Sequence, residues 1–225
     1  MKVHDPAKRA QRCRLAASCA AALLTLAPIG AVELTLDQRT INDAVLFGQS
    51  RIDTERRRFH ETYRITVRSG DIDFIEVVTP YRRVVLAAED AVAAADRSFG
   101  FKQAIALLDA APQQIDLHVE LTFNPLNVYV GVPAHTVALT AAGKPIAPRT
   151  FATYARYTPR ISERPSVSAV QGGFLKPGTS QPLIGGTMIA GFDGRLLNAK
   201  GTYSVVISRD GKDVARAGLD LGKLR

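Results

Sequence analysis

Residues 115–123, Ile-Asp-Leu-His-Val-Glu-Leu-Thr-Phe, decide the fold class of this chain. Apolar and polar residues alternate there, which is the period of a β-strand with one face in a core and one face in water. The alternation returns in residues 201–208 and is followed, after Arg209, by Asp210-Gly211. Because Asp-Gly favours two-residue hairpin turns of type I′, we expect a hairpin at the C-terminal end of the chain.

Other segments repeat this pattern of short strands and turns. Residues 60–78 are expected to form a hairpin around Ser69-Gly70-Asp71, and residues 135–141 a strand that ends at the turn 142–145. Further strands are predicted over residues 128–132, 151–157 and 187–192. Short strands about ten residues apart, with turn signals between them, predict a mainly β fold, an immunoglobulin-like β-sandwich.

Two helical segments are expected beside these strands. A short N-terminal helix is predicted over residues 36–48, with Thr35 and Gln38 as a capping box. A helical insertion is predicted around residues 80–111, because Thr79 suits an N-cap and Pro80 suits the first helical position. The charged residues 51–58 between them are interpreted as a connector.

Residues 158–186 are rich in proline, glycine and serine and show no periodicity. If they were a linker between domains, only about 39 residues would follow, which is near the lower limit for independent folding. We therefore expect residues 32–225 to form a single β-sandwich domain that contains the helical insertion (80–111) and a long loop (158–186).

Residues 1–31 have the pattern of a signal peptide. Five cations and one anion precede an uncharged apolar run over residues 16–29, and Ile29-Gly30-Ala31 offers the small residues that a signal peptidase requires. The run is shorter than the roughly 20 residues of a spanning helix. The expectation is cleavage after about residue 31 and a soluble, periplasmic or secreted protein with no transmembrane segment.

Cleavage would remove both cysteines, Cys13 and Cys19, so the mature chain would contain neither thiol nor disulfide. Of the 225 residues, 194 would remain, enough to bury a core without a covalent crosslink. With 24 cations and 20 anions left, the net charge falls from +8 to +4. That value is weak support for nucleic-acid binding, and export argues further against it.

The sequence offers one candidate constellation for a metal. His118 and Glu120 lie two residues apart on a predicted strand and so share a face, and His135 on another strand could add a third zinc ligand. The favoured interpretation is different: polar residues two apart are what the solvated face of a strand looks like. No cofactor is expected.

Other reactive signatures are absent from the sequence. It has neither a Gly-x-Ser-x-Gly elbow nor a glycine-rich phosphate loop, and the glycine pairs 172–173 and 185–186 are interpreted as loop geometry. Tryptophan, the usual platform for sugars, is missing. Arg56-Arg57-Arg58 and Arg82-Arg83 are interpreted as solvated surface charges.

These patterns predict a non-catalytic binding or structural module of the bacterial cell envelope. Its partner is expected to be a protein, docked on the edge of a β-strand. Two alternatives remain: a metal-dependent hydrolase that uses His118, Glu120 and His135, and a carrier of a small apolar ligand bound between a sheet and the helices of residues 80–111. The sequence gives no indication of oligomeric state.

Overall fold

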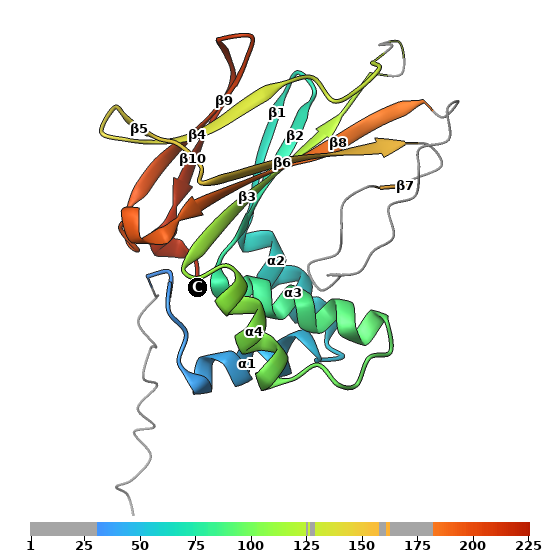
Figure 1. Ribbon diagram of the computed structural model, residues 1–225, viewed down its shortest axis with the longest axis vertical. Coiled ribbons are helices and arrows are strands. Elements are labelled where there is room, and N and C mark those ends of the chain that lie inside the picture. The colour runs from blue at the N-terminus through green and yellow to red at the C-terminus, as the bar shows by residue number, and fades with distance from the viewer. Residues whose placement is uncertain (1–30, 125, 127–128, 158–160, 163–181) are drawn as a thin grey trace, which may run out of the picture.

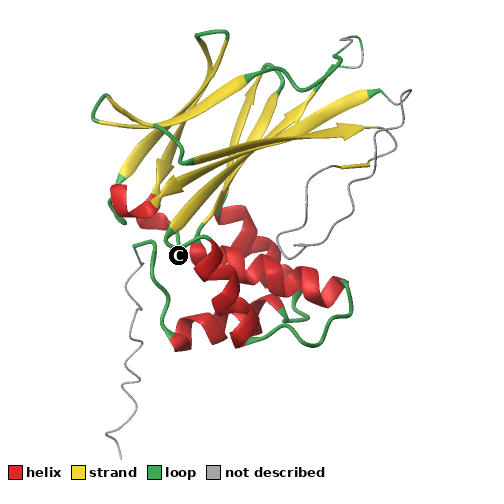
Figure 2. Cartoon of the chain, in the orientation of Figure 1, coloured by secondary structure: helices red, strands yellow, loops and turns green. Residues whose placement is uncertain are grey.

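The computed structural model describes residues 31–124, 126, 129–157, 161–162 and 182–225. The chain is mainly β, with two antiparallel sheets, and four α-helices gather at one end of the sheets (Figures 1 and 2). The predicted signal peptide lies outside the described residues except for Ala31, and so does most of the predicted loop 158–186. Within the described residues, no helix combines the length and apolar character needed to span a membrane.

The larger sheet has six strands in the order β1-β2-β3-β8-β6-β7, and the smaller has four in the order β10-β9-β4-β5. The strands of the larger sheet are β1 (Arg64–Ser69), β2 (Ile72–Val78), β3 (Gln114–Thr122), β6 (Thr150–Tyr157), β7 (Ile161–Ser162) and β8 (Leu183–Asp193). Those of the smaller sheet are β4 (His135–Ala141), β5 (Lys144–Ile146), β9 (Thr202–Arg209) and β10 (Lys212–Asp220).

The apolar half of each alternating segment forms the core between the two sheets. Leu117, Val119 and Leu121 of β3 are completely buried, in one cluster with Leu139 of β4 and Ile207 of β9. The periodicity of two therefore located these strands correctly.

The β9–β10 hairpin is confirmed as well. Asp210 and Gly211 both have positive φ, 52° and 75°, as a type I′ turn requires.

The helices form a second apolar cluster. They are α1 (Gln38–Gly48), α2 (Asp53–Thr62), α3 (Pro80–Ala93) and α4 (Phe101–Ala110). Ile41 and Val45 of α1 pack there with Val84 and Val85 of α3 and Ala104 of α4. The predicted helical block over residues 80–111 is thus confirmed, and so is its start, where the Thr79 hydroxyl accepts the Arg82 N–H at 3.2 Å.

Two details of the N-terminal region differ from the expectation. Asp37 caps α1 by accepting the Thr40 N–H at 2.7 Å, whereas the Thr35 hydroxyl accepts the Gln113 side-chain amide at 3.0 Å. Residues 53–58 are also not a connector, because they belong to α2. Two acidic residues in the first turn of α2 favour a helix there through the helix dipole, and the helix contains no fully buried residue.

Two strand predictions were wrong: one segment is not a strand, and one strand begins earlier than expected. Residues 129–132 are not a strand, and Val130 is 99% exposed in a connection that contains Pro133. At the other end of the predicted loop 158–186, residues 183–186 already belong to β8, so this strand starts four residues earlier than expected. Its glycines obscured the strand pattern in the sequence.

Arg82 and Arg83 join the helical layer to the larger sheet, and the interpretation that they are solvated was wrong. Arg82 is 1% exposed and donates to the Val77 carbonyl at 2.8 Å, with Glu76 at 3.4 Å. Arg83 is 4% exposed and donates to a carboxylate oxygen of Asp116 at 2.9 Å. Because α3 starts at the end of β2, its first turn lies against the ends of β2 and β3, and oxygens there accept hydrogen bonds from both arginines.

We predict that Arg83→Met destabilises the protein by about 3–5 kcal/mol, because the substitution leaves the Asp116 carboxylate without its cation in a buried position. Urea unfolding followed by circular dichroism measures this loss. The matched control is Arg195→Met, which removes an exposed partner of Asp193 and should shift the unfolding midpoint little. Equal midpoints for the two variants would contradict the assigned role of Arg83.

Candidate binding site at an open strand edge

The polar residues of β3 are buried, which overturns the expectation of a solvated strand face. Asp116, His118 and Glu120 are 9%, 4% and 8% exposed. The Glu120 carboxylate accepts the Thr187 hydroxyl at 2.7 Å and a guanidinium N–H of Arg156 at 3.0 Å. The alternation of apolar and polar residues identified the polar face of β3 correctly. It does not show whether other side chains cover that face.

Glycines of β8 make room for these polar side chains. A Cβ at Gly185 would lie 2.6 Å from Nη2 of Arg156. A Cβ at Gly191 would lie 2.3 Å from the Thr150 hydroxyl and 2.9 Å from Oδ1 of Asp116. Gly185 therefore belongs to a strand and serves close packing, and the interpretation of the pair 185–186 as loop geometry was wrong. The pair 172–173 lies outside the described residues.

The three candidate metal ligands lie on two different sheets. His118 and Glu120 are on β3, whereas His135 opens β4 of the smaller sheet, with its Nδ1 2.7 Å from the Pro133 carbonyl oxygen. Among the described residues, no group of three or more histidine, cysteine, aspartate or glutamate side chains could hold a metal ion. The Glu120 carboxylate is already used by Thr187 and Arg156.

Three of the four sheet edges carry features that discourage pairing with another chain. The β1 edge contains Arg64 and Arg68 and a break in register. The β10 edge contains Arg216 and a bulge, and β5 is only three residues long and includes Lys144 and Pro145. These edges are therefore poor sites for adding a strand.

The fourth edge ends in β7, which has only two residues, so β6 forms the rest of this edge. The pattern of hydrogen bonds on β8 determines which backbone groups of β6 are open. The Phe123 N–H donates to the Ile184 carbonyl at 3.0 Å across the β3–β8 pair. In an antiparallel pair the two backbone groups of a residue turn to the same side, and successive residues alternate. Thr187 and Ile189 of β8 therefore direct their backbone groups to β6.

The partners of these two residues on β6 are Tyr154 and Ala152. Phe151 and Thr153, which alternate with them, turn their N–H and C=O groups away from β8. The short strand β7 pairs only with residues 156–157 of β6. Among the described residues, no backbone partner covers the open groups of Phe151 and Thr153.

Residues 150–155 of β6 also lack the charged or proline side chains that usually protect a sheet edge from pairing. Residues 150–155, Thr-Phe-Ala-Thr-Tyr-Ala, contain neither a charge nor a proline, and Phe151 is 44% exposed. The sequence predicted a strand over residues 151–157 but gave no sign that it lies at an edge, because strand neighbours are non-local. The composition of residues 150–155 would have been the only signal of an edge that pairs. A strand segment without charges or proline needs a covered edge or a partner strand.

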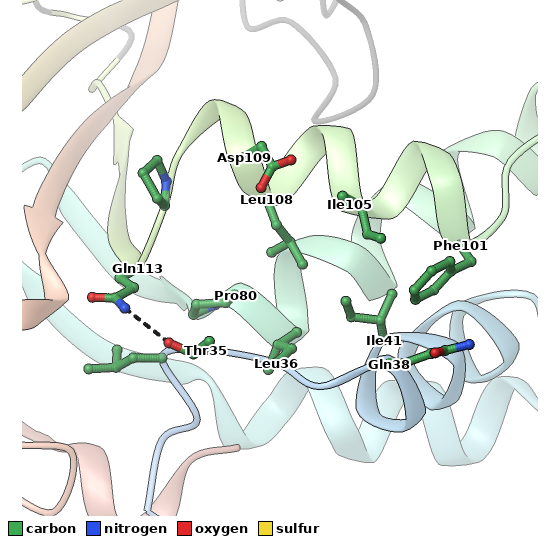
Figure 3. A pocket seen from close by; sticks show the side chains of 12 residues that line it. Thr35, Leu36, Gln38, Ile41, Pro80, Phe101, Ile105, Leu108, Asp109 and Gln113 are labelled. Carbon is green, nitrogen blue, oxygen red and sulfur yellow. Dashed lines mark hydrogen bonds between the residues drawn. The ribbon is translucent and has the colours of Figure 1, made fainter.

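A second concave feature lies in the helical layer. It is a groove of about 380 Å³ between α1 and α4 (Figure 3), here called the α1–α4 groove. The sequence placed an apolar pocket between a sheet and the helices of residues 80–111, whereas this groove lies between helices. Its walls are mostly apolar: Leu34, Leu36, Ile41, Pro80, Ile105 and Leu108.

Comparison of the chain with models of known protein families, with curated proteins and with solved structures finds no match.

We predict that Gly191→Ala destabilises the protein by about 1–3 kcal/mol, because the added methyl group meets the Thr150 hydroxyl and the Asp116 carboxylate. The control is Gly218→Ala on β10, where a Cβ meets no atom within 4 Å and the effect should stay within about 0.5 kcal/mol. Urea unfolding of both variants measures the difference. A neutral Gly191→Ala would show that the polar face is loosely packed.

Proposed function

We propose that this protein is an exported, soluble and non-catalytic binding module of the bacterial cell envelope. Its β6 edge, residues 150–154, accepts an extended segment of a partner protein as an additional strand. The observation that carries the proposal is the pair of backbone positions at Phe151 and Thr153, which no described residue covers and which lie in the uncharged stretch of residues 150–155. Addition of a strand to such an edge is a common mode of peptide recognition.

The support for export is the leader pattern of residues 1–31. The support for a binding role without catalysis is that ionisable groups of the polar face are engaged with one another, as in the Arg156–Glu120 and Arg83–Asp116 pairs. A metal-dependent hydrolase built on His118, Glu120 and His135 would need ligands from two different sheets to meet.

The architecture that we propose is an immunoglobulin-like β-sandwich. Its support is the passage of the chain between sheets: β3 and β4 lie in different sheets, as do β5 and β6, and again β8 and β9. Such crossings are typical of Greek-key sandwiches, whose two sheets share one core. The helical insertion of residues 80–111 then occupies the connection between β2 and β3.

A photo-crosslinking residue at position 151 should form a covalent adduct with a partner protein in cells of the native bacterium. Thr153→Pro, placed in the same chain, should reduce this adduct at least tenfold, because it removes an outward N–H that a docked strand requires. The matched crosslinking control is position 216 on the protected β10 edge, which should give no adduct.

Thr153→Pro should change the free energy of unfolding little, whereas Ala152→Pro removes a β8 hydrogen bond and should cost about 3 kcal/mol. The same adduct from positions 151 and 216, or an undiminished adduct with Thr153→Pro, would refute docking at β6.

Export is tested separately. Mass spectrometry of the protein recovered from the periplasm or medium should show a chain that begins at Val32, because cleavage is expected after Ala31. Recovery of the intact precursor from the cytoplasm would contradict the proposed location without bearing on the β6 edge.

A further inference from the structure

Independently of the β6 edge, we propose that the α1–α4 groove is a binding site for a single-chain amphiphile with a cationic head group. The groove has the three properties that such a ligand needs: an elongated apolar track, a polar end and one unpaired negative charge. Each of these properties comes from described residues.

The apolar track runs along α4. Phe101, Ile105 and Leu108 recur at helical spacing and line the groove from one side, facing Leu36 and Ile41 (Figure 3). From Phe101 to Leu108 the track extends about 10 Å at the rise of an α-helix. Its volume of about 380 Å³ lies within the range of small-molecule sites. An alkyl chain of medium length fits this shape.

The polar end lies beyond Leu108. There the Gln113 side-chain amide donates to the Thr35 hydroxyl at 3.0 Å, joining the segment before α1 to the segment after α4 (Figure 3). This bond closes the track at one end and leaves the Gln113 carbonyl oxygen as an acceptor for a donating head group.

Asp109 sets the sign of the charge that the groove accepts. It is the only ionisable one of the described residues that line the groove, and it is exposed on the rim next to Leu108 (Figure 3). Among the described residues no cation pairs with it. An ammonium head group near this carboxylate is attracted, whereas a fatty-acid carboxylate is repelled.

Isothermal titration of the mature protein with decylammonium, decanol and decanoate, each below its micellar concentration, tests the assignment. We expect saturable one-to-one binding of decylammonium and weaker binding of decanol. Decanoate should bind about tenfold more weakly than decylammonium, and added salt should reduce this difference. Absence of saturable decylammonium binding, or equal affinity for decanoate, would overturn the proposal.

Two variants separate the contribution of the ligand's head group to binding from that of its alkyl chain. Asp109→Asn should weaken decylammonium binding about three- to fivefold and leave decanol binding unchanged, whereas the control Glu55→Gln on α2 should change neither. Leu108→Gln should weaken both ligands about tenfold, whereas Leu46→Gln, at a 66% exposed position outside the groove, should not.

Urea unfolding checks that each variant is folded. If Leu108→Gln does not fold, the exposed Asp109 variant still decides the charge assignment. Equal effects of the groove and control variants would overturn the proposal. Failure here would leave the crosslinked adduct at position 151 unaffected, so the two sites are tested separately.

Discussion

The position of the helical layer depends on the buried contacts that the first turn of α3 makes with β2 and β3. Burial lowers the pKa of Arg82, and the neighbouring Glu76 carboxylate opposes that shift, so the guanidinium stays charged and held in place. Arg83 binds Asp116 and the carbonyls around the end of α4. Since α1 and α4 pack on α3, the same two arginines also fix the walls of the α1–α4 groove.

The polar face of the larger sheet holds β6 in the same manner. Arg156 of β6 reaches across β8 to the Glu120 carboxylate and the Leu121 carbonyl on β3, at 3.0 and 2.7 Å. At the other end of β6, Arg149 reaches the Gln114 side chain at 3.1 Å. Both contacts pass over glycines of β8, Gly185 under Arg156 and Gly191 under the Gln114 side chain. An edge fixed in this way loses less conformational entropy when a strand is added, which favours docking.

What the sequence predicted was local. The alternation in residues 115–123, the Thr79-Pro80 helix start and the Asp210-Gly211 turn each depend on residues close in the chain, and the structure confirms all three. What it missed was non-local. A polar strand residue such as His118 looks the same whether its face is covered or solvated, and only the order of strands reveals that β6 is an edge. For the same reason, spacing alone did not show that His135 lies in a different sheet from His118 and Glu120.

The two faces of β6 constrain the kind of strand that would fit the proposed docking edge. Phe151 and Thr153 pair with Ala190 and Met188, whose side chains belong to the core, so this side of an added strand meets apolar surface. Tyr154 pairs with Thr187 on the opposite, polar face. Main-chain hydrogen bonds provide affinity without selectivity, and selectivity must come from alternate side chains. A partner strand that alternates apolar and polar residues would match both faces, whereas a uniformly polar or uniformly apolar strand would leave one face poorly packed.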